Sequence, residues 1–267
     1  MPKIKVNDVN LYYEIHGKGQ PIVFIAGLIA DHTKWASVVD KFAKEYQVVV
    51  FDNRGTGQSD CPAYPYTIEM MADDVVGLCK NLGITSAHCV GNSMGGLIVQ
   101  MLAYKHPSFV KTAVICNSAI KFNNIKAKLM LESDSILRKA NAPIEARIKK
   151  ALCDLFSVSF LSKPNVADSL FNIFINNPYP ITDQGYFSQL HAAGSFDSQD
   201  WISKITAPSL VIYSDEDQYI DLDSFLALTK AIPNAESFCF NKVGHLPDTE
   251  QPELFIKVVK DFVKKFD

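Results

Sequence analysis

Hydrophobic runs alternate with segments of helical periodicity along most of the chain. Near the N-terminus, Ile4–Val6 and Leu11–Ile15 alternate apolar and polar residues around an Asn7-Asp8 turn, which predicts an antiparallel hairpin. The later runs are mostly unbroken and rich in β-branched residues, as is typical of parallel strands covered on both faces. These runs are Ile22–Ala26, Val48–Phe51, His88–Val90, Ala113–Cys116, Leu210–Tyr213 and Phe238–Phe240. The segments of helical periodicity are Trp35–Ala43, Met70–Leu82, Leu97–Tyr104, Phe225–Ala231 and Pro252–Phe266.

This alternation predicts an α/β fold, with a doubly wound, mostly parallel sheet of about eight strands and right-handed crossovers. The rhythm is interrupted over residues 119–196, where no strand run appears and prolines separate helical segments. We therefore expect residues 1–118 and 197–267 to form a core domain and residues 119–196 a helical cap inserted after the sixth strand. Such a cap would lie over the carboxyl edge of the sheet, where open α/β sheets bind ligands.

Composition narrows the class of protein. A chain of 267 residues with 48% hydrophobic and 21% charged residues can bury a large core, which excludes a disordered protein. The net charge of −3 argues against a general nucleic-acid binder, and the six cysteines are scattered, as in proteins with reduced thiols. The N-terminus has no apolar signal-peptide region, and no apolar stretch approaches the roughly 20 residues of a membrane span. We therefore expect a cytoplasmic protein that binds neither nucleic acid nor membrane.

One glycine-rich turn carries the strongest chemical signal. Gly91-Asn92-Ser93-Met94-Gly95-Gly96 follows the run His88–Val90 and opens the helical segment that starts at Leu97. A nucleophilic serine projects from a sharp strand-to-helix turn, which tolerates only small residues two positions before and after it. The N–H groups at the helix start then face the developing oxyanion. The alternative is an ordinary βα turn with a chance serine, but the flanking elements favour Ser93 as a nucleophile with the Met94 N–H as an oxyanion donor.

A serine nucleophile needs a base and an acid that orients the base. His245 follows the run Phe238–Phe240, and Asp217 follows the run Leu210–Tyr213, so both should lie at the edge where Ser93 emerges. Asp215 and Glu216 remain alternatives to Asp217. The other histidines lack the loop position of a base: we expect surface or structural roles for His16, His88 and His106, and leave substrate contact open for His32 and His191.

The second oxyanion donor is expected from the loop after the third strand. In Ala26-Gly27-Leu28-Ile29 we assign it to the Leu28 N–H. The other glycine motifs fit no cofactor, since Gly17-Lys18-Gly19 precedes a strand and Gly55–Ser59 lacks the ending of a phosphate loop. No spacing of histidines, cysteines and carboxylates suggests a metal site. We expect neither a cofactor nor a metal.

The motifs together resemble those of the α/β-hydrolase fold family along nearly the whole chain. They are Ala26-Gly27, Asp52 to Ser59, Gly91 to Gly96, Asp217, and Gly244-His245 with Glu250 to Glu253. The resemblance implies Ser93 as nucleophile, His245 as base and Asp217 as its orienting acid, with Asp52 and Arg54 bracing a loop near the oxyanion turn. The family usually has His-Gly where this chain has Ala26-Gly27, a change that removes a loop brace but no donor.

Within the family, two segments resemble the branch of 3-oxoadipate enol-lactonases and small carboxylesterases. They are Pro65–Glu69 with Ala72–Val75, and Gln189–Ala192 running into Ile205–Pro208. The resemblance implies hydrolysis of carboxylic esters or lactones through an acyl-enzyme, and a serine at position 93 argues against the dehalogenases and epoxide hydrolases, which use a carboxylate. One alternative is a carbon–carbon hydrolase of ring-cleavage diketones, although that branch usually has tryptophan where this chain has Leu246. Another is a ligand-sensing relative that retains the triad without turnover.

The predicted cap is basic, with nine Lys or Arg against six Asp or Glu, a net charge of +3 that leaves −6 for the rest of the chain. Solvated helix faces explain this charge, but it would also suit an acidic substrate or, by resemblance to the biotin-pathway methyl-ester esterase, an acidic carrier protein. The aromatic residues of the cap suit an acyl pocket or the cap's own core. Our candidate substrate contacts are His32, Phe156, Phe160, His191 and Leu246.

Overall fold

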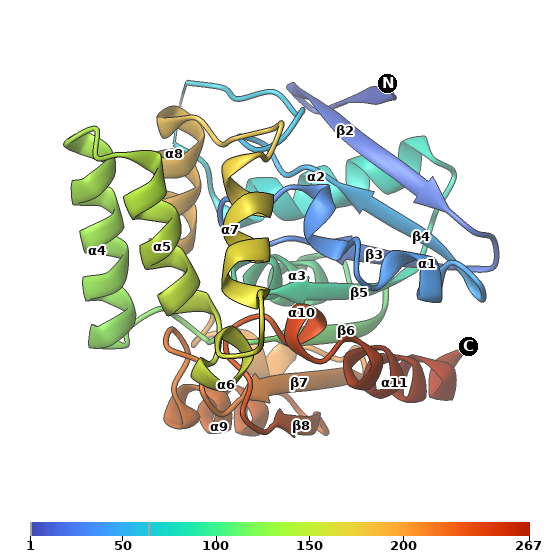
Figure 1. The fold of residues 1–267 in the computed structure, drawn as a ribbon. Coiled ribbons are helices and arrows are strands. Elements are labelled where there is room, and N and C mark those ends of the chain that lie inside the picture. The colour runs from blue at the N-terminus through green and yellow to red at the C-terminus, as the bar shows by residue number, and fades with distance from the viewer. Residues whose placement is uncertain (1, 64) are drawn as a thin grey trace.

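A mixed, mostly parallel sheet of eight strands runs through the computed structural model, which describes residues 2–63 and 65–267 (Figure 1). The strand order is β1-β2-β4-β3-β5-β6-β7-β8, with β1–β2 and β2–β4 antiparallel and the later pairs parallel. The strands are β1 (Lys3–Val6), β2 (Val9–His16), β3 (Gln20–Ile25), β4 (Tyr46–Phe51), β5 (Ala87–Asn92), β6 (Val110–Cys116), β7 (Ser209–Ser214) and β8 (Glu236–Phe240). The predicted fold class and each of its strand runs are confirmed.

The central strands are apolar at successive positions because both faces of the sheet are covered. On β3, Val23 and Ile25 pack into one core with α2 (Ile68–Asn81), α3 (Met94–Lys105) and α9 (Leu222–Ala231). On the same strand, Ile22 and Phe24 pack into a second core on the opposite face. Three helices cover that second face: η1 (His32–Trp35), α1 (Val39–Phe42) and α11 (Pro252–Val263). The remaining short helices of the core are η2 (Ile202–Lys204), α10 (Pro247–Glu250) and η3 (Lys264–Phe266).

The helix predicted over Trp35–Ala43 is two short helices, η1 and α1. The large apolar residues of this segment nevertheless pack into the same core: Trp35, Val38, Val39 and Phe42. Their spacing keeps the period of a helix across the break, which explains why the sequence pattern indicates a single element.

Five helices form an insert between β6 and β7, at the position predicted for the cap. They are α4 (Ile125–Lys139), α5 (Ile144–Leu155), α6 (Val158–Leu161), α7 (Val166–Ile175) and α8 (Asp183–Gly194). Figure 1 shows α4, α5 and α8 stacked beyond the end toward which β7 points, so the insert lies at the carboxyl edge of the sheet. The insert has an apolar cluster of its own, built on Ile148, Leu152, Phe156 and Leu170. The division of the chain at residues 118/119 and 196/197 stays a prediction.

Side-chain caps start several of these helices. Thr67 accepts a hydrogen bond from the Met70 N–H at the start of α2, and Asp221 accepts one from the Ser224 N–H at the start of α9. In the insert, Asn124 and Thr182 cap α4 and α8 in the same way. Among the described residues, no helix combines the length and apolar character that crossing a membrane requires.

Candidate active site

Ser93 occupies a strained turn between β5 and α3. Its backbone has φ 57° and ψ −121°, a conformation that non-glycine residues rarely adopt and that costs about 1–3 kcal/mol. The flanking glycines permit the turn: a Cβ on Gly91 would lie 2.1 Å from the carbonyl oxygen of Gly95, and a Cβ on Gly95 would lie 2.1 Å from that of Ile25. Ser93 Oγ makes no hydrogen bond within residues 2–63 and 65–267. The turn therefore has the strained, glycine-flanked geometry expected of a nucleophile.

Asp217 and His245 meet at the same edge of the sheet. His245 Nδ1 lies 2.7 Å from Asp217 Oδ2, and both side chains are buried. Asp217 lies in the loop after β7, and His245 lies in the loop between β8 and α10. An ionised carboxylate only accepts hydrogen bonds, so the proton is assigned to Nδ1 and Nε2 is left free to accept one. The geometry is that of a general base held in a single tautomer.

The second oxygen of Asp217 is also occupied. Asp217 Oδ1 accepts hydrogen bonds from the backbone N–H groups of Tyr219, at 2.8 Å, and Ile220, at 3.2 Å. Asp215, one of the alternative acids, instead accepts a hydrogen bond from the Val243 N–H. Of the three neighbouring acids, Asp217 is therefore the one that the structure brings to His245.

The loop of His245 is tied to the nucleophile turn and to the insert. The His245 carbonyl accepts hydrogen bonds from the side-chain amides of Asn92, the residue before Ser93, and Asn117. The His245 N–H donates to the carbonyl of Leu155, at the end of α5. The backbone of His245 is therefore held by two buried amides of the core and one carbonyl of the insert.

Glu250 makes a second tie between the same loop and the insert. Its carboxylate accepts hydrogen bonds from the Gly244 N–H and from both the N–H and the hydroxyl of Ser157. Burial raises the pKa of Glu250 above its usual value, although the hydrogen bonds from Ser157 and Gly244 oppose this shift. The resemblance places Glu250 within a family motif, and here its carboxylate joins the loop that carries His245 to the junction of α5 and α6.

The loop after β3 runs beside Ser93. A Cβ on Gly27 would lie 3.1 Å from the Cβ of Ser93 and 3.7 Å from its Oγ, so the backbone of this loop lies close against Ser93 and a larger residue would be tight there. Within the part of the chain that the structure describes, the N–H groups of Leu28 and Met94 donate no hydrogen bond. These are the two groups that the sequence predicts as oxyanion donors.

Tyr219 is a residue of the site that sequence reasoning missed. Its ring centroid lies 4.9 Å from that of His245, with the planes at 52°. Burial is the main reason that the pKa of its phenol is raised, and the charges of Asp154 and Asp134 in the insert add to the effect. Its position two residues after Asp217, in a loop already assigned to the site, was the signal that could have identified it.

Three of the predicted substrate contacts belong to one apolar cluster. Phe156 and Phe160 stack with centroids 5.7 Å apart, and Leu246, directly after His245, packs against the same cluster. His191 is exposed on α8, beside a hollow of about 270 Å³ between that helix and the loop containing Ala63 and Pro65. Substrate contact stays a prediction for all four residues.

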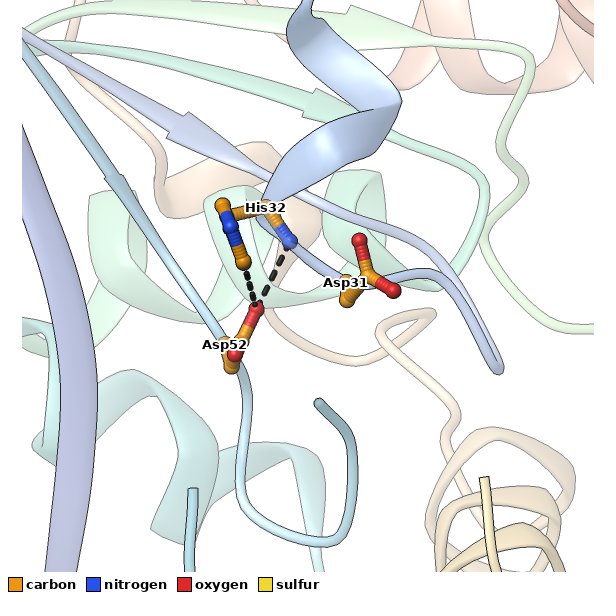
Figure 2. Close-up of side chains that lie close together, drawn as sticks. All are labelled: Asp31, His32 and Asp52. Carbon is orange, nitrogen blue, oxygen red and sulfur yellow. Dashed lines mark hydrogen bonds and ion pairs between the residues drawn. The ribbon is translucent and has the colours of Figure 1, made fainter. Parts of the chain in front are cut away.

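His32 contacts two carboxylates, those of Asp52 and Glu14. Its N–H and its Nδ1 lie 2.7 and 2.8 Å from the same oxygen of Asp52, as Figure 2 shows, and its Nε2 lies 3.6 Å from Glu14. Burial lowers the pKa of His32, but the hydrogen bond and charge of Asp52, with the charges of Asp31 and Glu14, outweigh it and raise the pKa above 6.5. His32 therefore braces the loop between β3 and η1, and its predicted substrate contact stays untested.

Asp31, His32 and Asp52 are also the described residues that could together hold a metal ion. Their ligand atoms lie within 4.8 Å of one another (Figure 2). Each of them already has hydrogen-bond partners: Asp31 accepts from Thr33 and Asn177, and Asp52 accepts from His32 and Gln58. The arrangement is therefore explained as a hydrogen-bond network that fixes two loops.

Asp52 and Arg54, which the resemblance implied as loop braces, are both buried. Arg54 forms two hydrogen bonds to Asp74 on α2, at 2.6 and 2.8 Å. Asp52 Oδ2 accepts a hydrogen bond from the Gln58 N–H at 2.7 Å. Both side chains thus fix the loop that follows β4.

The same architecture occurs in known proteins. A family model described as the alpha/beta hydrolase fold matches residues 20–248. The chain belongs to the α/β-hydrolase fold family. Among relatives in this family, 3-oxoadipate enol-lactonase 1 of Acinetobacter baylyi is 30% identical over 252 residues, which cover 91% of this chain and 88% of the relative.

Two further members of the α/β-hydrolase fold family extend the comparison. A protein of Caulobacter sp. that carries the name carbamate hydrolase RutD is 29% identical over 263 residues, 95% of each chain. The crystal structure of the enol-lactonase from Burkholderia xenovorans has a TM-score of 0.86 and 28% sequence identity, covering 98% of this chain and 100% of that one. The chain is thus an α/β hydrolase related to enol-lactonases.

Proposed function

We propose that the protein is a serine hydrolase that cleaves carboxylic ester or lactone bonds of a small acyl substrate. Ser93 is the nucleophile, His245 the general base and Asp217 the acid that orients it, while the N–H groups of Leu28 and Met94 bind the oxyanion. The observation that carries the proposal is the buried contact of 2.7 Å between His245 Nδ1 and Asp217 Oδ2, beside the strained turn of Ser93. The names of the relatives, which include two enol-lactonases, support the substrate class.

The reaction starts with attack of Ser93 Oγ on the substrate carbonyl carbon, while His245 Nε2 takes the hydroxyl proton. The carbonyl oxygen becomes an oxyanion, which accepts hydrogen bonds from Leu28 and Met94. Each such donor is worth about 2.7–4 kcal/mol of transition-state stabilisation. The intermediate collapses when the ester C–O bond breaks and the leaving alcohol takes the proton from His245, which leaves an acyl-enzyme on Ser93.

Water completes the cycle. His245 accepts a proton from the water molecule that attacks the acyl-enzyme, and a second oxyanion forms at the same two N–H groups. The bond to Ser93 Oγ then breaks, the hydroxyl regains its proton from His245, and the carboxylic acid leaves. With a lactone, the alcohol and the acid are released as one hydroxy acid, because the leaving oxygen stays attached to the acyl chain.

The proposal is tested by turnover of p-nitrophenyl esters from acetate to decanoate, with a lactone and a carbamate ester in the same panel. We expect Ser93→Ala to lower kcat by roughly 10³-fold or more, because the acyl-enzyme can no longer form. Ser209→Ala, which changes a buried serine at the start of β7 and away from the carboxyl edge of the sheet, serves as the control and should retain activity. Absence of wild-type turnover on every substrate would contradict the proposal and would direct attention to ring-cleavage diketones, and then to ligand binding without turnover.

A further inference from the structure

We propose that Gln189, on helix α8 of the insert, is a positioning residue for the loop after β3. It would hold this loop (Ala26–Ile29, here called the oxyanion loop) in its active conformation. This inference rests on the proposed function, because the donor that Gln189 would aim is the Leu28 N–H. Gln189 would act through the loop that contains Leu28 and would not itself touch the reacting atoms.

The side chain of Gln189 joins two loops of the core. It is fully buried, and both ends of its amide are used. Gln189 Oε1 accepts a hydrogen bond of 3.1 Å from the Ile29 N–H, in the loop after β3, and Nε2 donates one of 2.9 Å to the carbonyl of Arg54, in the loop after β4. A single side chain of the insert therefore fixes the backbone of both loops.

The loop after β3 needs such a contact. Ile29 has φ 65°, a conformation that is strained for a β-branched residue and persists only where its surroundings impose it. Gln189 binds the N–H of this strained residue, whereas the preceding N–H, that of Leu28, donates no hydrogen bond within residues 2–63 and 65–267. Fixing the peptide unit of Ile29 thus fixes the direction of the neighbouring donor, on a loop where Gly27 lies against Ser93.

Helix α8, which carries Gln189, packs directly on the loop after β4. A Cβ on Gly185 would lie 2.0 Å from the carbonyl oxygen of Gly55, so the backbones of α8 and of the loop after β4 are in direct contact. Gly185 and Gln189 are four residues apart and share one face of the helix. The insert therefore presents the amide from a helix that packs directly on the core.

A buried glutamine can also be merely structural, and the chain contains a matched example. Gln100 on α3 is equally buried, donates to the carbonyl of Ala119 and accepts from the hydroxyl of Ser198. It joins α3 to the two ends of the insert, and neither hydrogen bond reaches the loop that contains Leu28. Comparing the same substitution at positions 100 and 189 separates loss of stability from loss of catalytic geometry.

The experiment compares Gln189→Met with Gln100→Met in the full chain, using a p-nitrophenyl ester as substrate and phenylboronic acid as an inhibitor that forms a tetrahedral adduct on Ser93. Loss of a whole oxyanion donor costs about 10²–10³-fold in kcat, so we expect a misdirected donor in Gln189→Met to lower kcat by about tenfold or more. KM should change by less than about threefold, because ground-state binding is intact, and the inhibition constant of the boronic acid should rise in proportion to the loss of kcat/KM. We expect both variants to lower Tm by a similar amount, since each removes a buried amide with two hydrogen bonds. Gln100→Met should nevertheless leave kcat within about twofold of wild type.

Equal kcat and boronate affinity in wild type and Gln189→Met would overturn the inference, as would an equal loss of kcat in both variants. Should Gln189→Met fail to fold, Gln189→Asn replaces it: this amide is one methylene too short to reach both backbones, and the same loss of kcat without a change in KM is expected. A wild-type protein without Ser93-dependent turnover would overturn the proposed function and the inference together, whereas an active wild type with an unaffected Gln189→Met would overturn the inference alone.

Discussion

At the scale of single residues, Asp217 shows how one carboxylate holds a histidine in place. One oxygen faces His245 and the other accepts two backbone N–H groups, so the carboxylate cannot rotate without breaking three contacts. In the proposed mechanism, the same arrangement stabilises the imidazolium that forms during attack.

Asp217→Asn should therefore lower kcat by on the order of 10³–10⁴-fold, because an amide NH₂ group toward His245 would favour the wrong tautomer. The ester assay measures the effect, and Asp215→Asn is the control, since Asp215 contacts Val243 and not His245. Equal losses in the two variants would contradict the assignment of Asp217 as the orienting acid.

His32 gives a prediction about stability and pH. Its pKa in the folded protein is raised by Asp52 and its acidic neighbours, so the folded state holds the proton more tightly than the unfolded state does. The resulting stabilisation is fully present below the unfolded pKa and is lost as the pH rises through the folded pKa. The free energy of unfolding of wild type should therefore exceed that of His32→Gln most at acid pH, and urea titrations across the neutral range would measure the decline. A difference that is constant or grows with pH would refute this account.

The residues of the site differ in how far the sequence could predict them. Ser93, Asp217 and His245 each follow a clear strand run, and parallel strands bring their carboxyl ends together, so the meeting of Asp217 with His245 was predictable. The choice among three neighbouring acids was not, because it depends on which carboxylate the loop turns inward. Gln189 served only as a marker of resemblance. Its hydrogen-bond partners, Arg54 and Ile29, lie 135 and 160 positions away from it along the chain, so no local pattern points to them.

At the scale of elements, a buried ion pair joins the loop after β4 to helix α2. Arg54 and Asp74 are each almost completely buried and share two hydrogen bonds. Desolvation raises the pKa of Asp74 even though Arg54 opposes the shift, so the carboxylate depends on its partner to remain ionised.

Arg54→Leu should therefore destabilise the protein by about 3–5 kcal/mol, because it leaves a buried carboxylate without its charge partner. Urea unfolding measures the loss. Lys257→Met removes one partner of an exposed pair on α11, with Asp261, and should cost less than about 1 kcal/mol. Similar losses for the two variants would contradict the distinction between the buried and the exposed pair.

Elements of the sheet were more predictable than the arrangement of the insert. Each strand run of the sequence corresponds to a strand of the structure. The central strands are recognisable because a strand buried on both faces is almost continuously apolar, whereas β1 and β2 are recognisable from their alternation of apolar and polar residues. The apolar cluster of the insert joins only α5, α6 and α7. The place of α8 depends instead on contacts such as Gly185 on Gly55, which no periodicity reveals.

At the scale of the whole molecule, the insert contributes to the site as well as covering it. It touches the loop of His245 through Leu155 and Ser157, and the oxyanion loop through Gln189. Several of its cations already form ion pairs: Lys121 pairs with Asp197, Arg138 with Asp134 and Asp183, and Lys150 with Asp154. Of these acids only Asp197 lies outside the insert, so the pairs occupy cations but hardly change the net charge of the insert. Binding of an acidic carrier protein therefore stays a prediction, and it would have to use the remaining lysines.

The central claim, that Ser93 is the nucleophile of an acyl-transfer reaction, is tested most directly by covalent labelling. Diethyl p-nitrophenyl phosphate transfers its phosphoryl group to an activated serine and forms a stable adduct in place of the acyl-enzyme. Intact-mass and peptide mass spectrometry should show a single phosphoryl group on the peptide that contains Ser93, with parallel loss of ester turnover and no labelling of Ser93→Ala. An unlabelled Ser93, or an adduct on another residue in a protein that still hydrolyses esters, would contradict the account.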